Sequence, residues 1–270
     1  RRQRQMCIRD RCIAVRVKSR TAYSRVRIEV AETPFFSRSV SEFVLNRPRT
    51  EYTIYPDIIW NYEALKNNVQ AEPVSVAVKV EMNGDDLGQR VRTFSVRSIN
   101  ECLLGYVANG TKFYDTSIFF AAYVNEENPM IDQLLREALN TRIVNRFLGY
   151  QSKAKGVVDK QVYALWNILQ KRKFRYSSVS NTSLSSNVVF SQRVRTFDDA
   201  LDSSQINCVD GSVLFASLLR SINIDPILVR TPGHMFVGYY TDNSHKDMNF
   251  LETTMIGDVD LDDFLSLIHI

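Results

Sequence analysis

The chain has 270 residues, a length that favours two modest domains over one. Its apolar fraction of 44% can fill hydrophobic cores, and the sequence holds no low-complexity tract, so a globular chain is favoured over a disordered one. The formal net charge is +4, and no apolar run reaches the roughly 18 residues that a membrane-spanning helix needs.

The two ends of the sequence resemble one DNA element read in opposite directions. Back-translating Met6 to Arg11 and taking the reverse complement gives the Leu-Ser-Leu-Ile-His that opens residues 265–270. The element resembles a transposon-end adaptor used in preparing sequencing libraries. We therefore predict that residues 1–11 and 265–270 are not native, and that the sequence is a fragment of a longer bacterial, metagenomic protein.

Removing residues 1–11 changes the charge of the chain. They contain five Arg and one Asp, so they carry the whole +4 and the remainder is formally neutral. The apparent basicity is therefore no evidence for an anionic membrane, and we expect no nucleic acid as a partner. The remaining cysteines (Cys12, Cys102 and Cys208) are few and lack a CxxC spacing, so we expect no disulfide framework, no metal and no other cofactor.

The first half of the sequence predicts β-strands. Between residues 74 and 82, apolar side chains alternate with polar or small ones, and a turn is predicted at residues 83–86. Further extended runs are residues 13–18, 23–30, 42–45, 52–55, 90–97 and 117–124. Short strands separated by turns predict a β-sandwich domain over residues 12–126.

The pattern changes to a helical spacing at Asn128 and Pro129. One apolar stripe predicts a helix that continues to Phe147, and a second helix is predicted from about Asp159 to Lys171. A polar, serine-rich loop is predicted at residues 177–186. We therefore place a second domain at residues 127–264.

Cys208 lies where a loop ends and a helix is predicted to begin. Asn207 suits the N-cap, and Asp210 occupies the third helical position, where a carboxylate is favoured. A helix N-terminus favours thiolate over thiol and supplies free N–H groups for an oxyanion, to which Gln205 could add a donor. A lone cysteine is more often a small core residue, and Gln205 more often a polar loop residue, so both interpretations stay open.

Two candidate partners for this cysteine lie on the strands that follow. Strands are predicted at residues 226–230, 234–240 and 249–254, with a polar hairpin loop before the last. If the hairpin is symmetric about Asn243, His234 lies directly opposite Glu252, with Cβ atoms about 5 Å apart. Glu252 could then hold the imidazole tautomer and stabilise its charged form. A one-residue slip would place the two side chains on opposite faces.

Cysteine, histidine and carboxylate in this order form a nucleophile–base–orienter arrangement. Over about residues 130–256 the chain resembles the transglutaminase-like superfamily, on the segments Asn207-Cys208-Val209-Asp210, Leu218-Leu219-Arg220, Gly233-His234 and Glu252-Thr253-Thr254. The resemblance implies an α+β fold in which a papain- or transglutaminase-like core, with helices packed on an antiparallel sheet, follows the β-sandwich. It also implies a catalytic triad of Cys208, His234 and Glu252. Glu252 stands where the superfamily usually has Asp, and Asn207 where Gly is common.

The function implied by the resemblance is cysteine-dependent acyl transfer on an amide bond, through a thioester on Cys208 with His234 as the base. Hydrolysis of a protein or peptide is favoured. The alternatives are an amine-accepting transglutaminase, an inactive binding module that keeps the fold, and a structural extracellular protein that works through its β half. A sandwich joined to such a core, with few cysteines, leads us to expect a bacterial protein exported to the periplasm or the cell surface.

Overall fold

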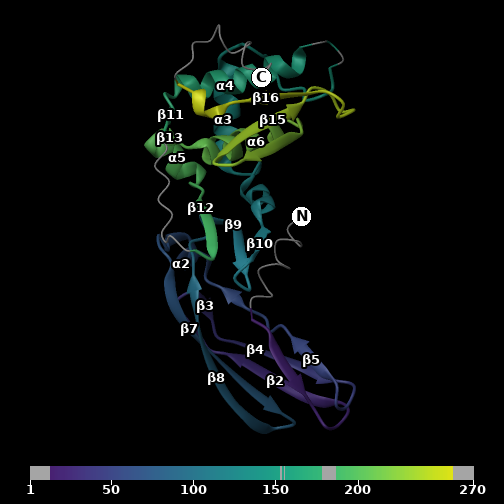
Figure 1. The fold of residues 1–270 in the computed structure, drawn as a ribbon. Helices are drawn as coiled ribbons and strands as arrows, with labels where there is room; N and C mark the ends of the chain where they lie inside the picture. The colour runs from purple at the N-terminus through teal and green to yellow at the C-terminus, as the bar shows by residue number, and fades with distance from the viewer. Residues whose placement is uncertain (1–12, 153, 155, 178–186, 258–270) are drawn as a thin grey trace. The chain divides into compact units, whose positions relative to one another are not determined.

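The computed structural model describes residues 13–152, 154, 156–177 and 187–257, and it has the mixed α+β fold that the sequence predicts (Figure 1). The chain divides into two compact units, one that ends at Ile99 and one that begins at Asn100. Cys12 and both ends predicted to be non-native lie outside the described residues. In the part of the chain that is described, no helix is long and apolar enough to cross a membrane.

The first unit is built around a four-stranded antiparallel sheet with the order β4-β2-β7-β8. Two two-stranded sheets, β1-β5 and β3-β6, and one short helix, α2, accompany it. The bounds are β1 Val15–Lys18, β2 Ser24–Val30, β3 Phe36–Ser37, β4 Ser39–Leu45, β5 Glu51–Ile54, β6 Ile59–Trp60, α2 Tyr62–Asn67, β7 Glu72–Met82 and β8 Asp85–Val96. The strands predicted near residues 13–18, 23–30, 42–45, 52–55, 74–82 and 90–97 are therefore present.

Alternating side chains give this sheet one buried face. Along β2, Val26, Ile28 and Val30 are buried, and on β7 Val74 and Val76 are buried in the same apolar cluster as Val30. Val17 of β1 and Ile54 of β5 share one apolar cluster with Val26 and Ile28, so the β1-β5 pair packs against the main sheet. The turn between β7 and β8 is shorter than predicted: only Asn83 and Gly84 separate the paired Met82 and Asp85, and both have positive φ, as two-residue hairpins require.

The boundary between the units lies earlier than residue 126, where the helical pattern placed it. Strands β9 (Glu101–Ala108) and β10 (Lys112–Asp115) belong to the second unit because β9 pairs with β12 (Val189–Arg193), which follows the first long helices. Pairing between strands so distant in sequence leaves no local signal. The segment at residues 117–124, predicted as a strand, is instead a 3-10 helix, η1 (Ser117–Tyr123).

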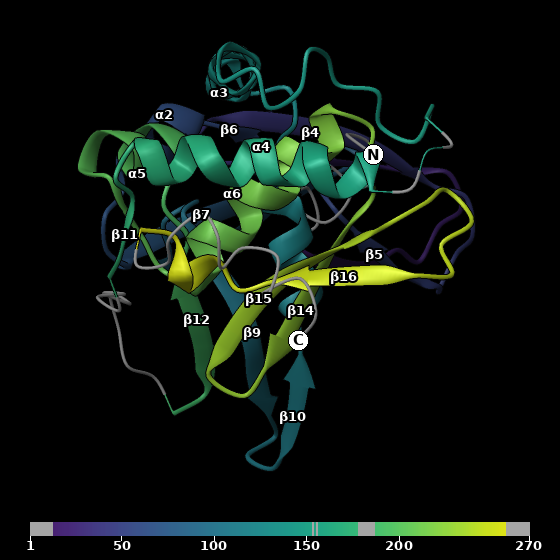
Figure 2. The same cartoon turned by 90° about the horizontal axis from the view of Figure 1, so that it is seen from above.

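The second unit packs three long helices with a three-stranded antiparallel sheet of order β14-β15-β16 (Figure 2). Helix α6 contacts β14 and β15 as well as α3 and α4. The bounds are α3 Pro129–Asn140, α4 Val157–Lys171, β11 Arg175–Tyr176, α5 Phe197–Ser203, β13 Gln205–Ile206, α6 Cys208–Ser221, β14 Pro226–Thr231, β15 His234–Tyr240, β16 Met248–Leu251 and η2 Thr253–Met255.

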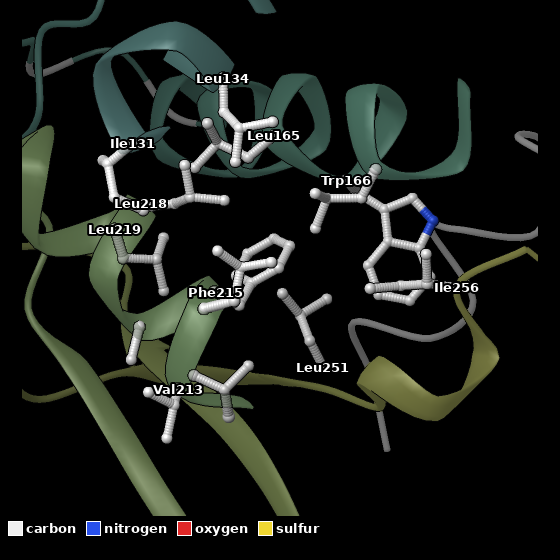
Figure 3. Packing of buried hydrophobic residues seen from close by; sticks show 14 of the residues in the cluster. Ile131, Leu134, Leu165, Trp166, Val213, Phe215, Leu218, Leu219, Leu251 and Ile256 are labelled. Carbon is white, nitrogen blue, oxygen red and sulfur yellow. The ribbon is translucent and has the colours of Figure 1, made fainter. Parts of the chain in front are cut away.

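Helix α6 is buried on every side. Every residue from Val209 to Leu219 is buried, and Phe215 is 0% exposed at its centre. Figure 3 shows Leu218 and Leu219 near Ile131 and Leu134, and Phe215 near Leu251 of β16. The buried hydroxyls of Ser212 and Ser217 donate to the carbonyls of Cys208 and Val213, which allows polar side chains in this position. The helix that carries Cys208 is therefore held rigidly in the core.

The first predicted helix of this unit is shorter than the apolar stripe suggested. Asn128 caps α3 and Pro129 opens it, as predicted, but α3 ends at Asn140, and Arg142 has a φ of 61°. Ile143, Val144 and Phe147 still pack against the core cluster from the segment beyond the helix. Their spacing therefore predicted burial correctly but the helix end wrongly.

Candidate active site

The N-terminus of α6 carries Cys208 at its first helical position, as predicted from the sequence. Asn207 is the N-cap: its side-chain oxygen accepts from the N–H groups of Val209, at 2.9 Å, and Asp210, at 2.8 Å. The Asp210 carboxylate accepts from the Asn207 N–H at 3.1 Å, which completes a capping box. Asn207 thus supports the site as a cap.

This capping pattern uses all but one of the N–H groups at the start of the helix. The Gly211 N–H donates to the Asn207 carbonyl at 3.0 Å, while Val209 and Asp210 donate to the Asn207 side chain. Among the described residues, no oxygen accepts from the Cys208 N–H. This N–H group is therefore available to a ligand oxygen at the same residue that carries the thiol.

The sulfur of Cys208 lies against the start of β15. Burial raises the pKa of the Cys208 thiol, and hydrogen bonds from the main-chain N–H groups of Met235, Val209 and Cys208 itself act in the opposite direction. The charge of Glu252 adds to the increase. The helix terminus by itself predicts a favoured thiolate, but desolvation outweighs that effect here. The Met235 contact brings the thiol next to the residue that follows His234.

His234 and Glu252 meet, although not by the expected register. The ladder pairs Val237 with Leu251 and Gly238 with Phe250, so residue 254 rather than Glu252 would lie opposite His234. The error is two residues, which keeps both side chains on one face of the sheet. Strand β16 also ends at Leu251, and Glu252 is the N-cap of η2. Nε2 of His234 lies 2.6 Å from Oε2 of Glu252.

The contact with Glu252 assigns roles to the two ring nitrogens of His234. An ionised carboxylate only accepts hydrogen bonds, so Nε2 carries the proton that it shares with Oε2. In a neutral imidazole, Nδ1 is then the nitrogen with a free lone pair. The side chains of His234 and Glu252 are 35% and 24% exposed, so the pair is open to solvent on one side.

Thr254 and Tyr176 also belong to the site, and sequence reasoning did not assign them a role. Thr254 donates to Oε1 of Glu252 from its hydroxyl, at 2.7 Å, and from its N–H, at 3.1 Å, which leaves Oε2 for His234. Burial, and then the charges of Cys208 and Glu252, raise the pKa of Tyr176. Tyr176 lies in β11, which contacts η2 and pairs with β13, the strand directly before Asn207.

Gln205 lies in β13, paired with Arg175, and its side chain is exposed. Its role as an oxyanion donor stays a prediction. The sequence did not indicate Tyr176 because it is distant in sequence from Cys208, His234 and Glu252. It reaches the site only through the parallel pairing of β11 with β13.

Comparisons with protein-family models, curated proteins and solved structures give no match to this chain. Within the described ranges, no group of three or more His, Cys, Asp or Glu side chains has an arrangement that could hold a metal ion. The site must therefore be judged from its own residues.

Proposed function

We propose that this chain is a cysteine-dependent acyl-transfer enzyme that acts on amide bonds of proteins or peptides, with hydrolysis as its reaction. One arrangement supports the proposal above all others. A thiol at the N-terminus of a buried helix contacts the main chain beside His234, and Glu252 is bonded to His234 through Nε2. Nucleophile, base and orienter are the three roles that such chemistry needs.

In the first step, Nδ1 of His234 takes the thiol proton and the sulfur of Cys208 attacks the amide carbonyl carbon. The carbonyl electron pair moves onto oxygen, and the Cys208 N–H stabilises this oxyanion, a contribution of roughly 10²–10³ in rate for one donor. Glu252 stabilises the imidazolium that forms. Because burial raises the pKa of the thiol, the reaction depends on His234 as the base that takes the thiol proton.

In the second step, the oxyanion collapses, the carbon–nitrogen bond breaks, and His234 returns its proton to the leaving amine. The acyl group remains on Cys208 as a thioester. A water molecule, deprotonated by His234, then attacks the thioester carbonyl and releases a carboxylic acid. Sulfur takes the proton back, so the enzyme is regenerated and one water is consumed.

Substitution of the two central residues tests the proposal. Iodoacetamide labelling, mapped to Cys208 in tryptic peptides, is compared with hydrolysis of fluorescent casein. We expect Cys208→Ala to abolish hydrolysis, and His234→Ala to lower the labelling rate of Cys208 at pH 7 by about tenfold or more. His245→Ala is the matched control, because His245 also binds a carboxylate, that of Asp225 at 2.8 Å, but lies in the distant hairpin loop.

Equal labelling of Cys208 in the wild type and in His234→Ala contradicts the proposal, because the histidine then does not act on the thiol. The same result supports a second candidate, a binding module without catalysis. The observation that favours this alternative is the raised pKa of the buried thiol. A module of this kind hydrolyses no casein and labels Cys208 equally slowly in both proteins.

A further inference from the structure

A buried ion pair lies directly beneath the N-terminus of α6. Oδ2 of Asp210 accepts from Nη1 of Arg195 at 2.5 Å, and Oδ1 accepts from the Arg195 main-chain N–H at 2.8 Å. The side chain of Asp210 is only 1% exposed and that of Arg195 is 19% exposed. Arg195 belongs to the segment between β12 and α5, which is distant from α6 in sequence.

This pair goes beyond what helix capping requires. A capping-box carboxylate needs only the N–H of its N-cap residue and is usually solvated. Burying a carboxylate and a guanidinium costs free energy unless every charged atom is well bonded, and such pairs are weak contributors to stability. Asp210 accepts three hydrogen bonds, one from Asn207 and two from Arg195, so its charge is well compensated.

The consequence of these bonds is a fixed peptide ahead of Cys208. On one side, Ile206 is held in the pairing of β13 with β11, and its carbonyl accepts from the Ser177 N–H at 2.9 Å. On the other side, Asp210 holds the Asn207 N–H. With both sides fixed, the main chain at Cys208 keeps one orientation, and the thiol stays in contact with the Met235 N–H of β15.

We propose that Asp210 and Arg195 are positioning residues for the Cys208 nucleophile, which hold its amide and thiol in the reactive orientation. The inference rests on the proposed function. It adds two residues that act through Cys208 rather than on the substrate. Three other groups near the thiol are Glu252 after β16, His234 on β15 and Tyr176 on β11, and all three stay unchanged in the test.

The test follows the rate of Cys208 alkylation by iodoacetamide between pH 5 and pH 10 in the full chain. We expect Asp210→Asn to lower the rate at pH 7 by about tenfold, because the N–H groups that stabilise the thiolate lose their alignment, and one pKa unit is tenfold in thiolate fraction. Arg195→Lys, which keeps the charge and the main-chain bond but loses the planar fork, should lower it about threefold.

Arg220→Gln is the matched control. Arg220 lies at the other end of the same helix and binds Glu126 at 2.6 Å and 2.8 Å, so its loss removes a similar ion pair without touching Cys208. The control should lower the melting temperature and leave alkylation unchanged. Alkylation in Asp210→Asn or Arg195→Lys that equals or exceeds the wild-type rate overturns the inference.

The pH–rate profile of Cys208 is measurable whether or not the protein hydrolyses casein. If the wild type hydrolyses no casein but Asp210→Asn shifts the pH–rate profile of Cys208, the result contradicts only the proposed enzymatic function. If the wild type hydrolyses casein but Asp210→Asn leaves the pH–rate profile of Cys208 unshifted, the result contradicts only the positioning role.

Discussion

The contact between α6 and η2 depends on a glycine, and replacing it gives a test that needs no substrate. Gly211 lies one turn beyond Cys208. A Cβ at this position would stand 2.7 Å from Oγ1 and 2.9 Å from Cβ of Thr253, and 3.3 Å from Cδ1 of Ile206. Thr253 directly follows Glu252, so any displacement of η2 moves the carboxylate that holds His234.

The magnitude follows from two opposing effects. Carbon atoms in contact prefer separations of about 3.5–4.0 Å, so Gly211→Ala must push Thr253 away by more than half an ångström. Overpacking of this kind costs about 1–3 kcal/mol. Replacing glycine by alanine inside a helix returns about 1 kcal/mol. We therefore expect a net loss of about 1 kcal/mol, or roughly 2–4 °C in melting temperature for a chain of this size.

A double-mutant cycle isolates the contact. Oγ1 of Thr253 is buried without a hydrogen-bond partner among the described residues, so Thr253→Ala should be nearly neutral by itself. In the pair Gly211→Ala/Thr253→Ala the closest clash, with Oγ1, is gone but Cβ of residue 253 still stands 2.9 Å away, so the melting temperature should recover in part. Thermal unfolding followed by circular dichroism measures all four proteins. Additive effects of the two substitutions would refute the reasoning, because they would show that the two side chains do not compete for space.

Two further predictions concern the core. Phe215→Ala should lower the free energy of unfolding in urea by about 3–5 kcal/mol because Phe215 is fully buried. Phe190→Ala, at a side chain 41% exposed, should lower it by less than about 1 kcal/mol. Equal losses in the two variants would contradict the assigned core. Burial raises the pKa of the Cys102 thiol to about 12, so the folded state keeps a proton that the unfolded chain loses near pH 9. The free energy of unfolding should therefore fall between about pH 9 and pH 12, by up to about 4 kcal/mol, and a wild-type decline no steeper than that of Cys102→Ala would contradict this burial.

Local signals in the sequence were sufficient to predict the start of α6 and the residue types of the site. Asn207 and Asp210 form the capping box that their spacing suggested, and Cys208 occupies the first helical position. Alternation likewise located β2 and β7. These features depend on hydrogen bonds and side-chain periods within a few residues, so the sequence contains them directly.

Features that depend on distant pairing could not be predicted in this way. The pairing of β9 with β12 places the boundary between units at Ile99, and the pairing of β11 with β13 brings Tyr176 to the site. Arg195 had no signal as the partner of Asp210. In each case the partner is chosen by packing across the whole unit.

By itself the sequence determined that a cysteine begins a helix and that a histidine opens a later strand. Only the tertiary structure decided how these residues meet. The observed hairpin register differs by two residues from the symmetric one, and His234 and Glu252 remain together because a two-residue shift preserves the face of a strand. Burial of α6 raised the pKa of the Cys208 thiol, because desolvation is a property of the packed core and not of the helix alone.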